Sequence, residues 1–277
     1  MPADIRTCVT GLVAAALVAA LVVSSPAEPT AREAVARARA LERSGRPDEA
    51  RTYLSELTAS DDRLAEEASV LLELARLTAD VDTLTTLLDA ALDAARRPEE
   101  IAAAHMMRGD LLFARGRYTA AAEEYARADR SAPAFRPGAA EFRRAESLLA
   151  ARDGSAALDA FTTIAEAPGT LEEIRPRAEL GAARALLELG RHEEAARSFE
   201  KVAAEYPDGD VRLLALSGAA EARAQIGDHA AATELLSSLV EEYPGTFHAT
   251  LALERLSRPA PPDTASADTT SPSNESR

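Results

Sequence analysis

The chain has 277 residues, of which 47% are hydrophobic and 4% aromatic, and its formal net charge is −15. A surface this acidic repels phosphate backbones, which excludes nucleic acid as an expected partner. A core of mainly alanine and leucine makes small, close contacts, which favour helices packed on helices. Because no sustained run of alternating β-branched residues occurs, we expect an all-α protein.

The N-terminus carries the pattern of an export signal. An apolar run of 13 residues, Gly11 to Val23, is followed by the small residues of a Ser25-x-Ala27 cleavage pattern. Extending the run back to Cys8 gives 16 residues, which is still short of the roughly 20 that a spanning helix needs. Asp4 offsets Arg6 ahead of the run, so an uncleaved anchor formed by residues 8–23 remains open as the alternative.

We therefore predict that residues 1–27 are a signal peptide or an N-terminal membrane anchor. The protein is then expected to be periplasmic or secreted, or else anchored in the inner membrane and facing outward. Cys8 is the only cysteine and precedes the apolar run, whereas a lipoprotein needs its cysteine just after that run. Cleavage would leave no cysteine, and therefore neither disulfides nor thiolate metal sites.

One pattern recurs between residues 31 and 257. The third copy reads GRYTAAAEEYARADRSAP, the fifth GRHEEAARSFEKVAAEYP and the sixth GDHAAATELLSSLVEEYP, while the first is shorter, the second is degenerate and the fourth has a small slip at its turn. The copies begin at Gly45, near Leu74, and at Gly116, Asp153, Gly190 and Gly227. Gly190 and Gly227 are 37 residues apart, and Gly116 and Gly190 are 74 apart, or twice 37. A period in this range indicates a solenoid.

Each position of the repeat has a physical reason. The glycine ends one helix, because a left-handed residue is least costly without a Cβ. The alanine five residues later lets the second helix cross the first closely. The large apolar residue four residues after that fills the gap to the next repeat, and the final proline stops the second helix.

These residues resemble the tetratricopeptide repeat family. The third copy carries the most consensus residues: Gly109, Gly116, Tyr118, Ala121, Tyr125, Ala128 and Pro133. The resemblance implies a right-handed α-solenoid of about six helix-turn-helix repeats over residues 31–257, with a capping helix in GTFHATLALERL from Gly245. Repeats of 36–37 residues ending in Tyr-Pro are similar to those of bacterial cell-envelope members of the family.

The fifth copy also contains two patterns that resemble catalytic sites. His192 precedes two glutamates, but His229 and Tyr118 hold the same repeat position, so we interpret the ring as structural. Ser198 and Lys201 fit an S-x-x-K pattern without its companion S-D-N and K-T-G motifs. We therefore predict no enzymatic activity, no cofactor and no metal site; a hydrolase on a helical scaffold is the competing class.

The resemblance implies that the first helices of successive repeats line a concave groove. Family positions ten, six and three residues before the turn point into it. The predicted protein-binding residues are Met106, Asp110, Phe113, Phe142, Glu146, Leu149, Leu180, Arg184, Leu187, Ser217 and Glu221. The set lacks the Lys/Asn group with which chaperone-binding relatives grip C-terminal carboxylates. We expect an extended segment or a helix of another protein to dock there; a solvated face without a specific ligand is the bland alternative.

The sequence thus predicts an exported, non-catalytic scaffold of the bacterial cell envelope. The alternative is a membrane-anchored accessory subunit of a translocation or envelope-assembly complex, with the membrane as a partner only if residues 8–23 stay uncleaved. Residues 258–277 are rich in Pro, Ser and Thr, and alanine is their only hydrophobic residue type. Such a segment cannot bury enough surface to offset its chain entropy, so we expect a disordered tail.

Overall fold

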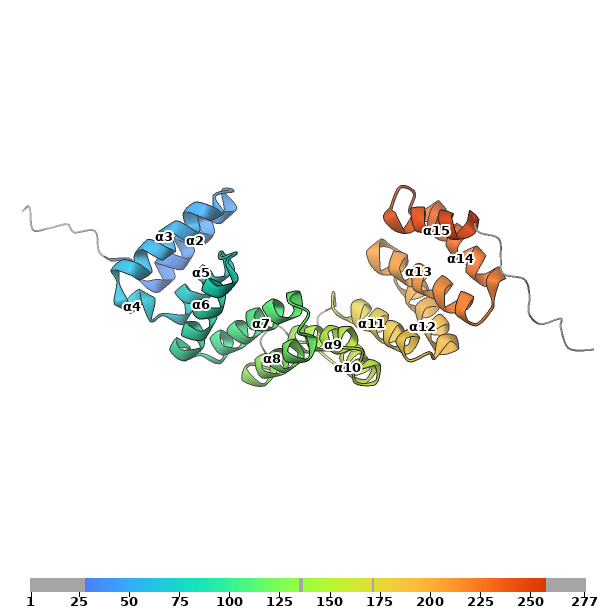
Figure 1. The fold of residues 1–277 in the computed structure, drawn as a ribbon, viewed down its shortest axis with the longest axis horizontal. Coiled ribbons are helices and arrows are strands. Elements are labelled where there is room, and N and C mark those ends of the chain that lie inside the picture. The colour runs from blue at the N-terminus through green and yellow to red at the C-terminus, as the bar shows by residue number, and fades with distance from the viewer. Residues whose placement is uncertain (1–27, 135–136, 171, 258–277) are drawn as a thin grey trace, which may run out of the picture. The chain divides into compact units, whose positions relative to one another are not determined.

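The structure is a computed structural model that describes residues 28–134, 137–170 and 172–257. These residues form fourteen α-helices and no strand, which confirms the all-α prediction (Figure 1). The predicted signal peptide or anchor and the predicted tail lie outside the described residues. No helix in the described ranges has both the length and the apolar character needed to cross a membrane.

The chain divides into two compact parts, residues 1–107 and residues 108–277, here called the N-terminal part and the C-terminal part. The N-terminal part contains α2 (Ala31–Arg43), α3 (Pro47–Ser60), α4 (Asp62–Ala65), α5 (Ala68–Arg76), α6 (Val81–Ala94) and the beginning of α7 (Pro98–Ala114). The C-terminal part contains the end of α7, α8 (Tyr118–Ser131), α9 (Ala139–Ala150), α10 (Gly154–Glu166), α11 (Arg175–Glu188), α12 (His192–Glu205), α13 (Gly209–Gln225), α14 (His229–Glu242) and α15 (Phe247–Ser257).

In the N-terminal part, α2 packs on α3, α5 packs on α6, and α2 also contacts α5. An ion-pair network joins α2 to α5, the first helices of successive repeats: Arg39 and Arg76 both pair with Glu73, whose side chain is only 4% exposed. Arg76 also pairs with Glu42 on α2. A buried carboxylate needs such partners, because an unpaired charge loses its hydration without compensation. The short α4 was not predicted; the Asp61 side chain caps it by accepting from the Arg63 backbone N–H.

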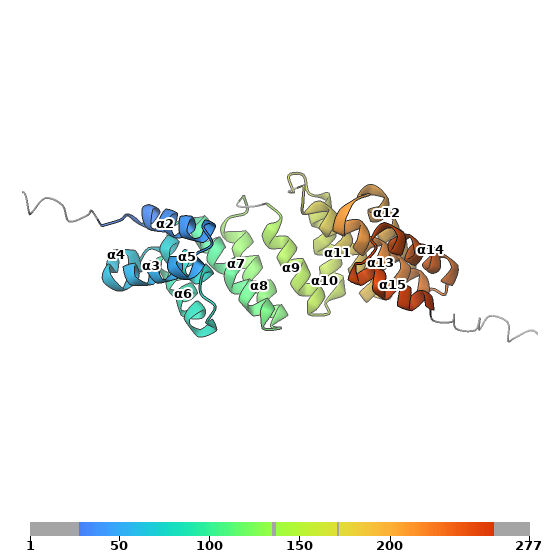
Figure 2. The same cartoon turned by 90° about the horizontal axis from the view of Figure 1, so that it is seen from above.

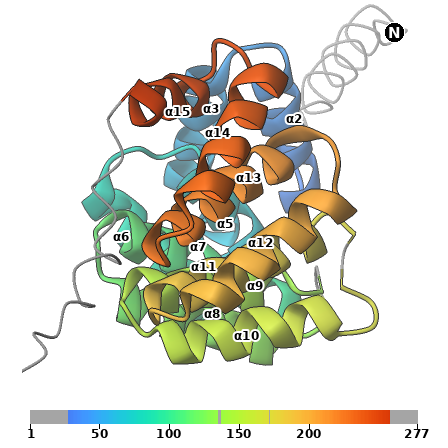
Figure 3. The ribbon, with the colours of Figure 1, turned by 90° about the vertical axis from the view of Figure 1, so that its right-hand side faces the viewer.

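In the C-terminal part, each helix from α8 to α15 packs on the next in chain order, as a solenoid requires, and α9, α10 and α11 follow one another in Figure 2. The last helix, α15, packs on both α14 and α13 (Figure 3). It occupies the predicted capping position, but its surface is not purely polar, because Phe247 is 77% and Leu253 53% exposed.

The packing positions predicted from the repeat are buried as expected. The alanines five residues after the turn are Ala50, Ala121, Ala157, Ala195 and Ala232, and all are buried. The large residues four positions later are Leu54, Tyr125, Phe161, Phe199 and Leu236, and they too are buried. Small residues at the helix crossing and large ones at the joint between helices therefore build the core.

The turns between paired helices use a left-handed residue. Gly190 and Gly227 adopt φ angles of 72° and 81°, a region that costs an L-residue with a Cβ free energy. In the fourth repeat the residue with positive φ is Arg152, at 65°, so the slip seen in the sequence is an arginine in the glycine position. Gly154 instead begins α10, where an added Cβ would come 3.1 Å from Cγ of Leu189. That glycine serves helix packing and not the turn.

Three further glycines receive aromatic rings. A Cβ on Gly109 would lie 2.6 Å from the Tyr125 ring, and a Cβ on Gly181 would lie 2.6 Å from the Phe161 ring. Gly218 meets Phe199 at the same 2.6 Å distance. In the last two cases the ring comes from the second helix of one repeat and the glycine from the first helix of the next. These contacts bring successive repeats close together.

Candidate functional site

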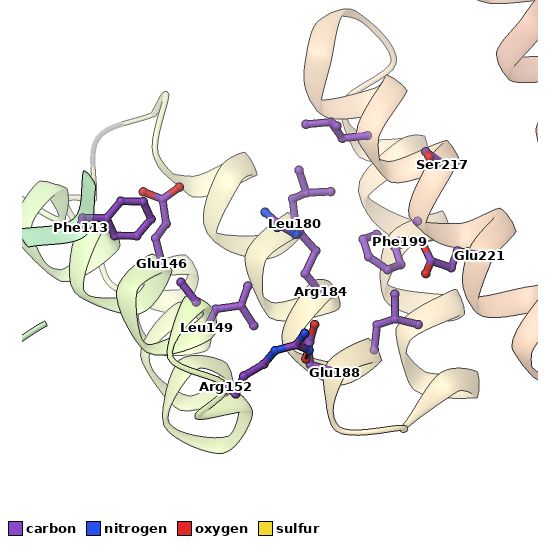
Figure 4. Close-up of a pocket in the computed structure, with 14 residues that line it drawn as sticks. Phe113, Glu146, Leu149, Arg152, Leu180, Arg184, Glu188, Phe199, Ser217 and Glu221 are labelled. Atoms are coloured by element: carbon purple, nitrogen blue, oxygen red, sulfur yellow. Dashed lines mark hydrogen bonds and ion pairs between the residues drawn. The ribbon is translucent and has the colours of Figure 1, made fainter. Parts of the chain in front are cut away.

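A cleft of about 590 Å³ opens on the C-terminal part, where α9, α11 and α13 lie side by side (Figure 4). These are the first helices of the fourth, fifth and sixth repeats. Eight of the predicted binding residues line the cleft: Phe113, Glu146, Leu149, Leu180, Arg184, Leu187, Ser217 and Glu221. Positions that are far apart in the sequence therefore converge on one surface, because the repeat brings equivalent faces of successive first helices together.

The other three predicted residues are placed differently. The Asp110 carboxylate accepts a 2.7 Å hydrogen bond from the Tyr125 hydroxyl, and Phe142 packs edge-on against Phe161 with ring centroids 5.7 Å apart. Asp110 also lies 3.8 Å from Arg143 of the next repeat, and neither Asp110 nor Phe142 lines the cleft. Met106 is partly buried in the N-terminal part, and its binding role stays a prediction.

The hydrogen bond to Asp110 also changes the chemistry of Tyr125. Burial raises the pKa of the Tyr125 hydroxyl, and the neighbouring Asp110 carboxylate raises it further. A phenolate in this place would lose hydration and face a negative charge. Tyr125 therefore remains a neutral hydrogen-bond donor.

Sequence reasoning missed several residues of the cleft, chiefly Phe199, Leu214 and Gly218. Leu214, Ser217, Gly218 and Glu221 follow the i, i+3, i+4, i+7 spacing of one helix face, so extending the face of Glu221 by two turns would have found Leu214. Phe199 was assigned to the core, and it is only 1% exposed. Its ring forms the floor of the cleft because Gly218, packed over it, has no side chain.

The charged side chains of the cleft fall into two groups. Arg152 pairs with Glu188, and Glu146 lies 3.3 Å from Arg143, so these charges are already matched. Arg184 and Glu221 are both exposed, and within the described residues neither has an ion pair or hydrogen bond. Figure 4 shows the Phe199 ring between them. The cleft thus has an apolar floor flanked by one cation and one anion that have no partner among the described residues.

The patterns that resembled catalytic sites lie elsewhere. His192 and His229 begin α12 and α14 as partly buried rings, in keeping with equivalent repeat positions. Lys201 lies 3.6 Å from Glu205, one turn away on α12, while Ser198 is beside the buried Phe199. In the part of the chain that the structure describes, no cluster of three or more His, Cys, Asp or Glu residues could hold a metal ion.

The sequence model of the tetratricopeptide repeat matches residues 35–80, 86–134, 142–210 and 180–247. The chain belongs to the tetratricopeptide repeat family. This agrees with the six helix pairs, the short α4 and the final single helix that the described residues form. Tetratricopeptide folds are typically binding scaffolds. A search of the curated proteins finds no match to this tetratricopeptide repeat chain.

Solved structures share the fold. A tetratricopeptide repeat protein from Parabacteroides merdae is 17% identical with a TM-score of 0.64, covering 82% of this chain and 85% of its own. PilW, described as a type IV pilus biogenesis factor, is 16% identical with a TM-score of 0.63, covering 80% and 98%. YrrB, described as having an unusual peptide-binding site, is 21% identical with a TM-score of 0.52, covering 71% and 97%. At these identities the likeness concerns the fold alone.

Proposed function

We propose that the C-terminal part is a protein-binding module and that its cleft takes an extended segment of another protein. The observation that carries this proposal is the apolar lining of the cleft, in which the 40% exposed Leu214 lies with the partly buried Leu149 and Leu187 among charged residues. The description of YrrB as peptide-binding supports this class of ligand. The module acts by binding, without a catalytic step of its own, since His192 holds a repeat position and Ser198 lies in mid-helix beside the buried Phe199 without companion motifs.

The expected energetics follow from the lining. Burying one large apolar side chain of a partner contributes about 1.5–3 kcal/mol, so a side chain placed against Leu214 and Leu187 would supply much of the affinity. The exposed charges at the rim would contribute mainly to selectivity and to the rate of association.

Leu214 and Leu189 provide a matched test. Both are 40% exposed, but only Leu214 lines the cleft, while Leu189 follows α11 and packs against Gly154. Peptides selected from a displayed random library on the full chain should bind the Leu214→Ser variant at least about tenfold more weakly, by the loss of an apolar contact. The Leu189→Ser variant should bind them like the wild type. Failure to enrich peptides, or equal binding by both variants, would contradict the proposal.

We also propose that the protein is exported and acts in the bacterial cell envelope. The apolar run and cleavage pattern in residues 1–27 support this, and so does the fold shared with the pilus biogenesis factor PilW. Intact mass measured on protein from the envelope fraction should show a chain beginning near Glu28. A full-length chain in that fraction would favour the membrane-anchored accessory subunit, and a chain confined to the cytosol would refute export.

A further inference from the structure

We infer that the segment bound in the cleft carries one large apolar side chain between an acidic and a basic residue. This inference rests on the proposed binding function and specifies its ligand. Arg184 on α11 and Glu221 on α13 are exposed charges of opposite sign on the two sides of the Phe199 floor (Figure 4). They occupy the same position in successive repeats, 37 residues apart.

Charge complementarity selects this ligand because the remaining charges of the cleft are already paired. Arg152 has Glu188, and Glu146 has Arg143. Arg184 and Glu221, without partners in the described ranges, can each accept an opposite charge from a ligand without breaking an existing pair. A ligand with two like charges would satisfy one of them and repel the other.

The helix spacing sets the distance between the two ligand charges. Packed helices lie about 8–10 Å apart, and an extended chain advances about 3.3 Å per residue. The acidic residue facing Arg184 and the basic residue facing Glu221 should therefore be about three positions apart in the ligand. That leaves room for the apolar residue between them, over Gly218 and the Phe199 ring packed beneath it.

Two occupants supplied by this chain fit less well. Residues 258–277 contain no hydrophobic side chain larger than alanine, so they cannot fill the apolar floor. A second copy could offer the exposed Phe247, but no acidic residue stands within three positions of it in the sequence. It could also offer Leu189 between Glu188 and Arg191, but these charges already pair with Arg152 and Glu194, and the leucine packs against Gly154. Glu254 and Arg255 both follow Leu253 in the sequence, so this leucine does not lie between an acidic and a basic residue. The occupant we commit to is therefore a segment of a different protein.

Charge exchange provides the experiment. Three sets of fluorescein-labelled synthetic peptides of equal length would place a leucine or phenylalanine between an aspartate and a lysine, between two aspartates, or between two lysines. Fluorescence anisotropy would measure their binding to the full chain and to Arg184→Glu, Glu221→Arg and the double variant. The wild type should prefer the mixed peptides, Arg184→Glu the lysine pair, and Glu221→Arg the aspartate pair.

The double variant should return to the mixed peptides, because it again presents one charge of each sign. Each preference should amount to about three- to fivefold and should decrease at high salt, since these charges are exposed. Arg197→Glu on α12 and Glu234→Arg on α14 are matched controls. They change the net charge equally, they affect exposed residues that do not line the cleft, and they should leave the preference unchanged.

The outcomes separate this inference from the function on which it rests. If no peptide set binds, the binding function itself fails. If all sets bind equally to all four proteins, or the controls shift the preference as much, the binding function stands and the charge rule is wrong. Tighter peptide binding by a chain ending at Ser257 would assign the cleft to the chain's own C-terminal residues. A dimer lost in Leu214→Ser would assign it to a second copy; either result would overturn the inferred partner.

Discussion

The joints between α10 and α11 and between α12 and α13 have the same construction and different surroundings. In each, a phenylalanine of the second helix meets a glycine of the next repeat, Phe161 with Gly181 and Phe199 with Gly218. Only the second joint lines the cleft. Ten residues before its turn residue, the fourth repeat has Phe142, which packs edge-on against Phe161. The fifth repeat has Leu180 at the same position. The repeat thus builds the joint, and the neighbouring side chains decide whether it lines the cleft.

The largest expected effect compares the two phenylalanines. Phe161→Ala and Phe199→Ala should each lower the free energy of unfolding by about 3–5 kcal/mol, because both rings are fully buried. Phe161→Ala should cost about 0.5–1.5 kcal/mol more, since it also loses the edge-to-face contact with Phe142. Urea unfolding followed by circular dichroism measures both. A greater loss for Phe199→Ala would show that the two joints are not equivalent in packing.

A smaller effect concerns the turns of the same two repeats. Gly190→Ala should destabilise the protein by about 1 kcal/mol through backbone strain alone, because an added Cβ meets nothing within 4 Å. At the other turn, Arg152→Gly and Arg152→Ala both remove the ion pair with Glu188, but only the glycine relieves the positive φ. The glycine variant should therefore be more stable than the alanine variant by about 1 kcal/mol. Equal urea midpoints for the two would mean that the arginine turn stores no strain.

The smallest effect concerns Tyr125, whose ring meets Gly109 of its own repeat instead of a glycine of the next repeat. Burial, followed by the hydrogen bond with Asp110, raises the pKa of Tyr125 above its ordinary value of about 10. Above about pH 10 the unfolded chain loses the phenolic proton while the native protein retains it, so this contribution to stability is lost as the pH rises. Urea unfolding at pH 8 and pH 10.5 should show a shallower decline for Tyr125→Phe than for the wild type. Some decline should remain, because burial also raises the pKa values of Tyr206 and Tyr243. An identical decline in both proteins would contradict this assignment.

Much of the fold could be predicted because the repeat is encoded locally. Each repeat has a glycine at the turn, an alanine five residues later and a large apolar residue four residues beyond that. In the fifth repeat Gly190 adopts the left-handed turn conformation, while Ala195 and Phe199 are buried in the core as predicted. The helix pairs followed from the period. Arg152 escaped prediction because its left-handed conformation is imposed by the helices on both sides and not by its own preference.

The candidate site was only partly predictable. The face shared by Glu146, Arg184 and Glu221 followed from equivalent repeat positions, whereas the different placements of Asp110 and Phe142 depend on Tyr125 and Phe161 across the helix pair. Ion-pair choice was equally inaccessible, since Arg152 and Glu188 are 36 residues apart and meet only when repeats stack.

The sequence by itself determined the helical class, the repeat period and the residues that form each turn and crossing, because these depend on contacts a few residues apart. Tertiary structure alone decided that Phe199, a core residue by its pattern, also forms the floor of a cleft. It does so because Gly218 of the next repeat packs directly on the ring and brings no side chain of its own into the cleft. Stacking of the repeats likewise decided which charges pair with one another and which, at Arg184 and Glu221, have no partner among the described residues.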